Sequence, residues 1–129
     1  ALPIWQSRTN PFSGLELEVF KYIKETYSEA KSQFTIVGLP YLPDIYMPEL
    51  NLIIEIYGDY FHCNPKYWPA DKFNQTLQMT GSEKLEKDKK RIEEIIKAGY
   101  QVEIIWEMQL REDFYGSINK VLKKYNENY

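Results

Sequence analysis

The sequence has few of the residues that build a disulfide framework, a structural zinc site or a membrane span. Its 129 residues include one cysteine, Cys63, which excludes an internal disulfide and disfavours a cysteine-based zinc site. The apolar run Leu52–Ile54 ends at Glu55, far short of the roughly 20 residues of a transmembrane helix. The N-terminus lacks the basic region followed by an apolar one that marks a signal peptide. These absences predict an intracellular protein in a reducing setting, with no membrane partner.

The sequence also has little net charge, which is −3 from 16 basic and 19 acidic residues. This value argues against a stand-alone nucleic-acid clamp, because such a clamp neutralises phosphates with an excess of basic residues. It does not exclude a nuclease, because carboxylates that hold a metal lower the formal charge and the bound cation restores it. A separate, tethered DNA-binding domain could also deliver a weakly binding nuclease.

The length fits one domain, and 43 % apolar with 27 % charged residues is typical of a globular protein. Residues 1–12 contain Pro3 and Pro11 with little periodicity, and we expect them to form an extended N-terminal arm. Residues 13–129 are predicted to form a single domain. The first residue is Ala1, not Met, so we expect the chain to be a piece of a longer protein.

The apolar periodicity predicts an α/β fold with a mixed sheet flanked by helices. Helices are expected over 13–32, 82–98 and 113–125, and strands over 34–37, 44–47, 52–57 and 101–106. Because a helix separates the last strand from the others, that strand should run parallel to a neighbour. Residues 58–81 have no regular period and are predicted to be a long, functional loop.

Two of the predicted helices carry clear local signals. Ser13-Gly14-Leu15-Glu16 resembles a capping box, and Gly99 suits a C-cap. The apolar stripes expected to be buried are Val19, Phe20, Ile23 and Tyr27 in the first helix, and Leu85, Ile92, Ile95 and Ile96 in the second.

Four acidic residues occupy positions where these patterns call for apolar ones. Glu16 and Asp88 share the stripes of their helices, Glu55 interrupts a central strand, and Asp44 begins a hairpin strand. Burying a carboxylate is costly unless a cation or hydrogen bonds compensate for it. Acids on neighbouring elements therefore suggest one shared metal ion.

Each acid also has a purely structural explanation. Glu16 could complete the capping box with Ser13, and Asp88 could pair with nearby lysines. Asp44 could cap the turn after the preceding proline, and Glu55 could form a buried pair or lie at an exposed edge.

The only histidine, His62, lies just beyond the central strand, where the functional sites of open sheets gather. A lone histidine can equally be structural. The same loop holds Tyr60, Phe61, Tyr67 and Trp68, which could pack locally or stack against nucleic-acid bases.

Several segments carry a resemblance to a known group. They are Pro43-Asp44, Gly58 with His62, Glu86-Lys87-Asp88-Lys89-Lys90-Arg91-Ile92, Gly99-Tyr100-Gln101-Val102 and Ile104-Ile105-Trp106-Glu107. Together they resemble the very-short-patch repair (Vsr) endonucleases, and most of all the Vsr-like homing endonucleases with an EDxHD site. The resemblance runs from about Ser13 to Glu107. It implies the PD-(D/E)XK nuclease fold, whose restriction-endonuclease-like core has the order αβββαβ.

The resemblance implies that Glu16, Asp44, His62 and Asp88 are the catalytic residues. Asp44 would bind Mg²⁺ together with the backbone carbonyl of Ile56, and His62 would be the general base. Glu16 and Asp88 would bind metal-coordinated waters or orient His62.

Three further residues enter as candidates for DNA binding, and one as a candidate metal ligand. Tyr60 and Phe61 occupy positions where Vsr enzymes place DNA-intercalating aromatics, and Trp68 follows in the same loop. Glu55 is a candidate metal ligand, although it has no acidic counterpart in Vsr enzymes.

The sequence also differs from the patterns of the families that it resembles. The lysine of the wider (D/E)XK pattern is absent, because Tyr57 follows Glu55 and Ile56. The zinc ligands of Vsr enzymes are missing, with Asp59 in the place of one cysteine, and only His62 remains of the Vsr histidines. These departures favour the homing-endonuclease branch over mismatch repair.

The predicted function is thus Mg²⁺-dependent hydrolysis of phosphodiester bonds in double-stranded DNA, leaving a 5′-phosphate. One site cuts one strand, so a double-strand break requires a homodimer, transient pairing or two successive nicks. The alternatives are a mismatch-type DNA-repair nicking endonuclease and, from another class, an inactive nuclease fold that serves as a binding module.

Overall fold

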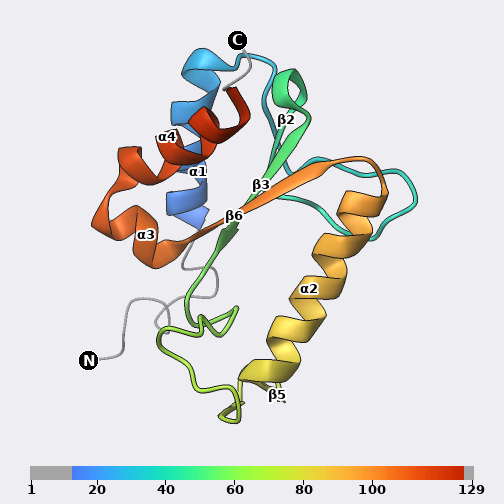
Figure 1. Ribbon diagram of the computed structural model, residues 1–129, viewed down its shortest axis with the longest axis vertical. Helices are drawn as coiled ribbons and strands as arrows, with labels where there is room; N and C mark the ends of the chain where they lie inside the picture. Colours follow the sequence, from blue (N-terminus) through green and yellow to red (C-terminus); the bar gives the residue numbers. More distant parts are fainter. Residues whose placement is uncertain (1–12, 127–129) are drawn as a thin grey trace.

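The computed structural model describes residues 13–126 of the chain (Figure 1). The predicted arm over residues 1–12 lies outside the described residues. The side chain of Ser13 lies outside them as well, and with it the expected capping box between Ser13 and Glu16.

The centre of the fold is a four-stranded mixed sheet with the strand order β1-β2-β3-β6. The strands are β1 (Lys31–Ser32), β2 (Ile45–Met47), β3 (Leu52–Tyr57) and β6 (Gln101–Trp106). β3 pairs antiparallel with β2, across the short 3-10 turn η2 (Pro48–Leu50), and parallel with β6. The predicted hairpin, the mixed α/β class and the parallel last strand are therefore confirmed.

Helices cover both faces of this sheet. α1 (Ser13–Thr26) and α4 (Phe114–Asn126) lie on one face, and α2 (Gly81–Lys97) crosses the other, while the short α3 (Glu107–Glu112) links β6 to α4 (Figure 1). Among residues 13–126, no helix combines the length and the apolarity needed to cross a membrane.

The strand β3 forms the core, because all six of its residues are buried. Alternate side chains of a strand point to opposite faces. Leu52, Ile54 and Ile56 accordingly pack in the cluster under α1 and α4, whereas Ile53 packs under α2. Glu55 and Tyr57 have the same parity as Ile53, so the polar end of β3 lies on the α2 face.

The predicted strand over residues 34–37 is wrong. The first strand is instead Lys31–Ser32, which pairs with Tyr46 and Ile45 of β2. It ends because Gln33 adopts a left-handed backbone with φ of 52°, while its N–H donates to the carbonyl of Asp44 at 3.1 Å. Leaving the strand here lets Phe34 stack on Tyr46, with ring centroids 4.4 Å apart.

The helix boundaries differ from prediction in places. The first helix ends at Thr26 rather than near residue 32, since a turn closed by the Ala30 N–H and the Tyr27 carbonyl follows it. The closing helix spans Phe114–Asn126, against 113–125 predicted, and α3 was not predicted.

The crossover helix α2 closely matches the predicted range of 82–98. Thr80 and Glu83 form a capping box at its start, and Gly99 follows its end with φ of +108°, a conformation that glycine adopts without strain. The expectation that Ile96 is buried is wrong, because 52 % of this residue is exposed.

The predicted long loop over residues 58–81 contains a small antiparallel hairpin, β4 (Phe73–Asn74) with β5 (Met79–Thr80). The fully buried Asn74 amide donates to the Tyr60 carbonyl at 3.2 Å and to the Cys63 sulfur at 3.6 Å. A buried side-chain amide thus connects the two halves of this segment.

Removing core volume from β3 should destabilise the protein strongly. Ile54 has no exposed surface, so Ile54→Ala should lower the free energy of unfolding by about 3 kcal/mol in urea denaturation. The matched control is Ile96→Ala on the exposed side of α2, with an expected change of about 0.5 kcal/mol or less. Equal losses in the two variants would contradict this description of the core.

Candidate functional site

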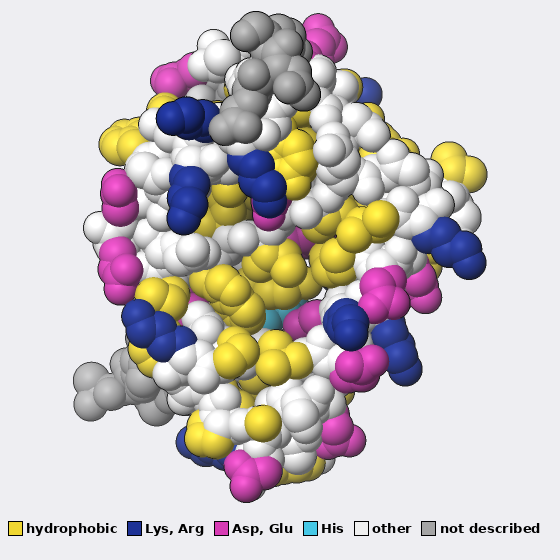
Figure 2. Space-filling view, viewed as in Figure 1, with side chains coloured by type: hydrophobic (Ala, Val, Ile, Leu, Met, Phe, Trp, Pro, Cys, Tyr) yellow, Lys and Arg dark blue, Asp and Glu magenta, His cyan; other side chains and the backbone are white. Residues whose placement is uncertain are grey.

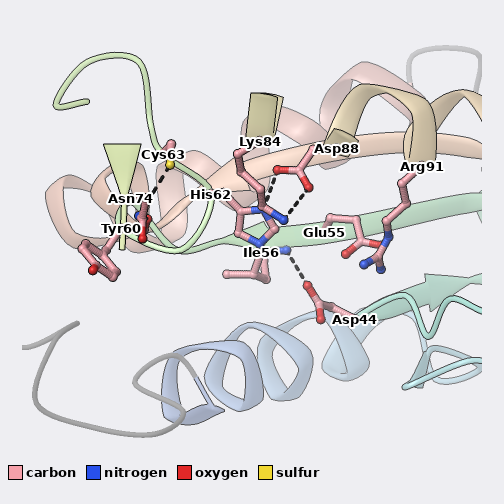
Figure 3. Close-up of polar contacts among 10 residues, drawn as sticks. All are labelled: Asp44, Glu55, Ile56, Tyr60, His62, Cys63, Asn74, Lys84, Asp88 and Arg91. Carbon is pink, nitrogen blue, oxygen red and sulfur yellow. Dashed lines mark hydrogen bonds and ion pairs between the residues drawn. The ribbon is translucent and has the colours of Figure 1, made fainter. Parts of the chain in front are cut away.

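The α2 face of the sheet carries a histidine bound to a buried carboxylate (Figure 3). The Nδ1 atom of His62 lies 2.8 Å from Oδ2 of Asp88, and the Nζ atom of Lys84 lies 2.9 Å from Oδ1. Burial alone would raise the pKa of Asp88, but the contacts with His62 and Lys84 outweigh it and leave the pKa below its usual value. Asp88 is therefore an ionised carboxylate that holds one side of the imidazole ring.

The plane of the His62 ring is set by an aromatic contact. The ring stacks on Tyr57, with centroids 3.8 Å apart and planes 6° from parallel. The backbone N–H of His62 donates to the Gly58 carbonyl at 3.0 Å. With Nδ1 directed at Asp88, Nε2 is the nitrogen available for proton transfer. The His62 side chain is 22 % exposed, and the histidine, coloured cyan, is visible in a hollow edged by hydrophobic side chains (Figure 2).

Two carboxyl groups lie together near the end of β3. Oδ2 of Asp44 accepts the backbone N–H of Ile56 at 2.8 Å, and Asp44 also shares a hydrogen bond with Glu55. Burial and the neighbouring Asp44 charge raise the pKa of Glu55 to about 8, although Arg91 opposes this shift. Burial also raises the pKa of Asp44. The two carboxyls share a hydrogen bond, and the raised pKa of Glu55 means that this side chain holds the shared proton near neutral pH.

Glu55 is also held by a cation from the crossover helix. Nη2 of Arg91 lies 3.0 Å from Oε1 of Glu55, and the guanidinium lies 5.1 Å from the centre of the Tyr41 ring. Among the alternatives for Glu55, the buried pair is thus confirmed and the exposed edge is wrong.

Glu16 approaches this carboxyl pair from α1. It accepts a hydrogen bond from Nε2 of Gln33 at 2.9 Å, and Gln33 also donates its backbone N–H to Asp44. Burial and the nearby Asp44 charge raise the pKa of Glu16 to about 7, against the effect of the Gln33 hydrogen bond. Gln33 thus links the Glu16 carboxyl group to the backbone carbonyl of Asp44, and no sequence pattern indicated this role.

The predicted site residues therefore form two neighbouring groups near the end of β3. His62 and Asp88 form one, and Asp44, Glu55 and Glu16 form the other. Burial raises the pKa of Asp44 overall, and His62 is among the neighbours that partly offset this rise, so the two groups lie within electrostatic reach of each other (Figure 3).

The four acids do not combine into a single metal cluster. Within residues 13–126, no three His, Cys, Asp or Glu side chains are grouped so that they could hold a metal ion. Asp88 is instead paired with a lysine, as its structural alternative predicted, as well as with His62.

The candidate DNA-binding aromatics pack against one another. Tyr60 makes edge contacts with Phe61 and Trp68, with centroid distances of 5.2 and 5.6 Å. The Trp68 indole N–H donates to the Lys72 carbonyl at 3.0 Å, and the Tyr60 hydroxyl lies 2.7 Å from that of Thr76. Local packing, one of the two alternatives for this loop, is therefore observed.

A buried acid that was not singled out as a site residue supports the start of this loop. Glu107 is fully buried at the beginning of α3, where it accepts the Asp59 N–H at 3.3 Å and pairs with Arg111 at 2.6 Å. Burial raises the pKa of Glu107, while Arg111 opposes the rise. The sequence signals for Glu107 were its place directly after the strand at 101–106 and its inclusion in the last segment of the Vsr resemblance.

A separate groove of about 640 Å³ lies between α1 and the α3–α4 segment. It is lined mainly by apolar and aromatic residues, among them Leu15, Tyr22, Phe114 and Tyr115. None of the residues of the His62 and Asp44 groups lines it.

No family model, no curated protein and no solved structure matches this chain. The chemistry of the site must therefore be inferred from its own geometry. An imidazole oriented by a carboxylate can transfer protons, and an adjacent pair of carboxyl oxygens can bind a hard cation.

The stability of the protein should fall as the pH rises from about 5 to 8. The folded state keeps the Glu55 proton up to a pKa of about 8, whereas the unfolded chain releases it near 4.5. The proton therefore stabilises the folded state below pH 4.5, and this stabilisation is lost as the pH rises through 8. Urea midpoints measured at pH 5 and pH 8 will test this.

The variant Glu55→Gln keeps a hydrogen-bond acceptor for Arg91 and should reduce the loss of stability between these two pH values. Glu18→Gln, on the exposed side of α1, is the matched control and should leave the loss unchanged. A urea midpoint of the unmodified protein that does not change with pH would contradict the burial of a protonated Glu55.

Proposed function

We propose that this chain is the catalytic domain of a Mg²⁺-dependent endonuclease that hydrolyses phosphodiester bonds in double-stranded DNA. The core would be of the PD-(D/E)XK type, and the site would be closest to the EDxHD homing endonucleases. The observation that carries the proposal is the His62–Asp88 pair beside the Asp44–Glu55 carboxyls on one face of a mixed sheet.

The donor atoms of the carboxyl group fit Mg²⁺. This ion prefers oxygen ligands, binds through one or two carboxylates and keeps several waters, so it does not need a larger acidic cluster. Asp44 and Glu55 would hold it, together with the backbone carbonyl of Ile56. The raised pKa values of both carboxyls fit this, because a bound cation would offset the cost of burying their charges and the repulsion between them. When bound, Mg²⁺ polarises a phosphoryl oxygen and lowers the pKa of water.

His62 would act as the general base for the attacking water. Its Nδ1–H donates to Asp88, so Nε2 carries the lone pair that accepts the proton. Asp88 then stabilises the imidazolium that forms. Proton transfer of this kind contributes roughly 10²–10⁴-fold to a reaction rate.

Glu16, Lys84 and Arg91 would support the reaction without acting as the base. Glu16, with a pKa of about 7, can donate or accept a hydrogen bond with water near neutral pH. Lys84 and Arg91 bring positive charge to the same face of the sheet, where a phosphodiester anion would have to bind.

The DNA would lie across the loop that carries His62. Tyr60, Phe61 and Trp68 offer aromatic surface beside the imidazole, and aromatic rings stack readily on bases. Because the net charge is −3, affinity and target choice would come from a tethered DNA-binding domain inside the cell. One such site makes a nick, and two copies or two successive nicks would make a double-strand break.

One observation favours a second candidate function, an inactive nuclease fold used as a binding module. Glu55 and Asp88 are each already paired with a basic side chain, and no three-ligand metal group is present among the described residues. Plasmid nicking that requires Mg²⁺ and stops on chelation separates the enzyme from the module.

Replacing Asp44 or His62 should abolish cleavage while the domain stays folded. Asp44→Asn removes the ligand charge and His62→Gln removes the base, so each should lower the Mg²⁺-dependent nicking rate by about 10²-fold or more. Asp71→Asn, in the exposed part of the loop, is the control and should cut at the original rate. Circular dichroism checks that all three variants fold; full activity of either site variant would refute the assignment.

A further inference from the structure

We infer that Tyr57 is a positioning residue for His62 and fixes the imidazole plane in which the base acts. The inference rests on the proposed function of His62 and extends it to a residue that the sequence did not assign to the site. Its basis is the stacked pair at the end of β3, where the ring centroids are 3.8 Å apart and the planes differ by 6°.

Tyr57 is itself fixed in place. It is the last residue of β3, only 3 % of it is exposed, and it pairs in register with Trp106 of β6. The Trp106 ring contacts Tyr57 edge-on, with centroids 5.3 Å apart and an interplanar angle of 82°. The Tyr57 ring is thus a rigid surface on the central strand, whereas His62 belongs to the loop that follows.

The hydrogen bond to Asp88 cannot fix the imidazole by itself. One bond at Nδ1 sets the direction of that nitrogen but allows the ring to rotate about the N–H···O axis, which moves Nε2. A flat surface packed against the ring face removes this rotation. The bond to Asp88 and the stack on Tyr57 together determine where the lone pair of Nε2 points.

The face of the Tyr57 ring also interacts electrostatically with the imidazole. A positive charge over the face of an aromatic ring is attracted by its electrons. The contact with Tyr57 therefore strengthens as the imidazole takes up a proton, which is the step proposed for His62. An aliphatic side chain of similar volume would fill the space but give no such attraction.

The hydroxyl of Tyr57 is not needed for this role. It is buried and makes no hydrogen bond with any of the described residues. A buried hydroxyl without a partner does not stabilise the fold. The contributions of the ring and of the hydroxyl can therefore be measured separately, because phenylalanine keeps the ring and lacks the hydroxyl.

The test compares Tyr57→Phe with Tyr57→Met in the whole chain. Tyr57→Phe should keep kcat for Mg²⁺-dependent nicking within about threefold and leave the ring-proton NMR signals of His62 in place. Tyr57→Met should lower kcat by about 10²-fold, the usual cost of a misplaced reacting group, with little change in KM. The His62 ring-proton signals should move downfield, because the shielding by the tyrosine ring is lost.

The control is a second stacked aromatic pair, in the hydrophobic cluster around Ile53. Phe34 stacks on Tyr46 with centroids 4.4 Å apart, and Phe34→Met removes an aromatic ring away from His62. This variant should change neither kcat nor the His62 signals. If Tyr57→Met does not fold, Tyr57→Leu takes its place.

The inference is overturned if the nonaromatic variant cuts at the original rate, or if its His62 signals stay where they are. Failure of the proposed function gives a different result. A folded protein that cuts no DNA at all refutes the nuclease, while the NMR comparison still shows whether Tyr57 sets the ring of His62.

Discussion

The complete burial of β3 is the constraint on which the rest of the structure depends. An ionisable group on a strand that is covered on both faces needs a partner inside the protein. Glu55 carries such a group under α2, and α2 supplies Arg91 to Glu55 and Asp88 to the histidine that stacks on Tyr57. The candidate site is thus assembled from side chains of α2 and of the following loop around two positions of the central strand.

The elements that were predicted well are those in which burial determines the order of apolar and polar residues. β3 and β6 are rich in apolar residues, and the crossover helix between them favours the parallel pairing. The strand expected at 34–37 failed for the opposite reason. Its apolar and aromatic residues suit a strand, but Gln33 turns the chain out of the sheet, and Phe34 instead packs partly buried against Tyr46. Local pattern cannot distinguish burial in a strand from burial in a loop.

The candidate site could likewise be predicted only in part. Acids that break an apolar pattern can be found from the sequence, and Glu55 and Asp88 are buried, as their positions suggested. The partners of the site acids cannot be found in this way, because Arg91, the partner of Glu55, is one basic residue among several in α2. Gln33, the partner of Glu16, follows a two-residue strand and has no distinctive sequence pattern. Only the docking of α2 and α1 on the sheet determines which of these side chains reach the carboxyls.

The contacts of the site join parts of the chain that are far apart in sequence. His62 and Asp88 are separated by 26 positions, and Glu55 and Arg91 by 36. Contacts of this range form only after the intervening chain has closed a large loop, a step that is slow compared with the winding of a helix. A nascent or partly folded chain therefore lacks the oriented imidazole altogether, and whatever reaction this site supports begins only when the domain is complete.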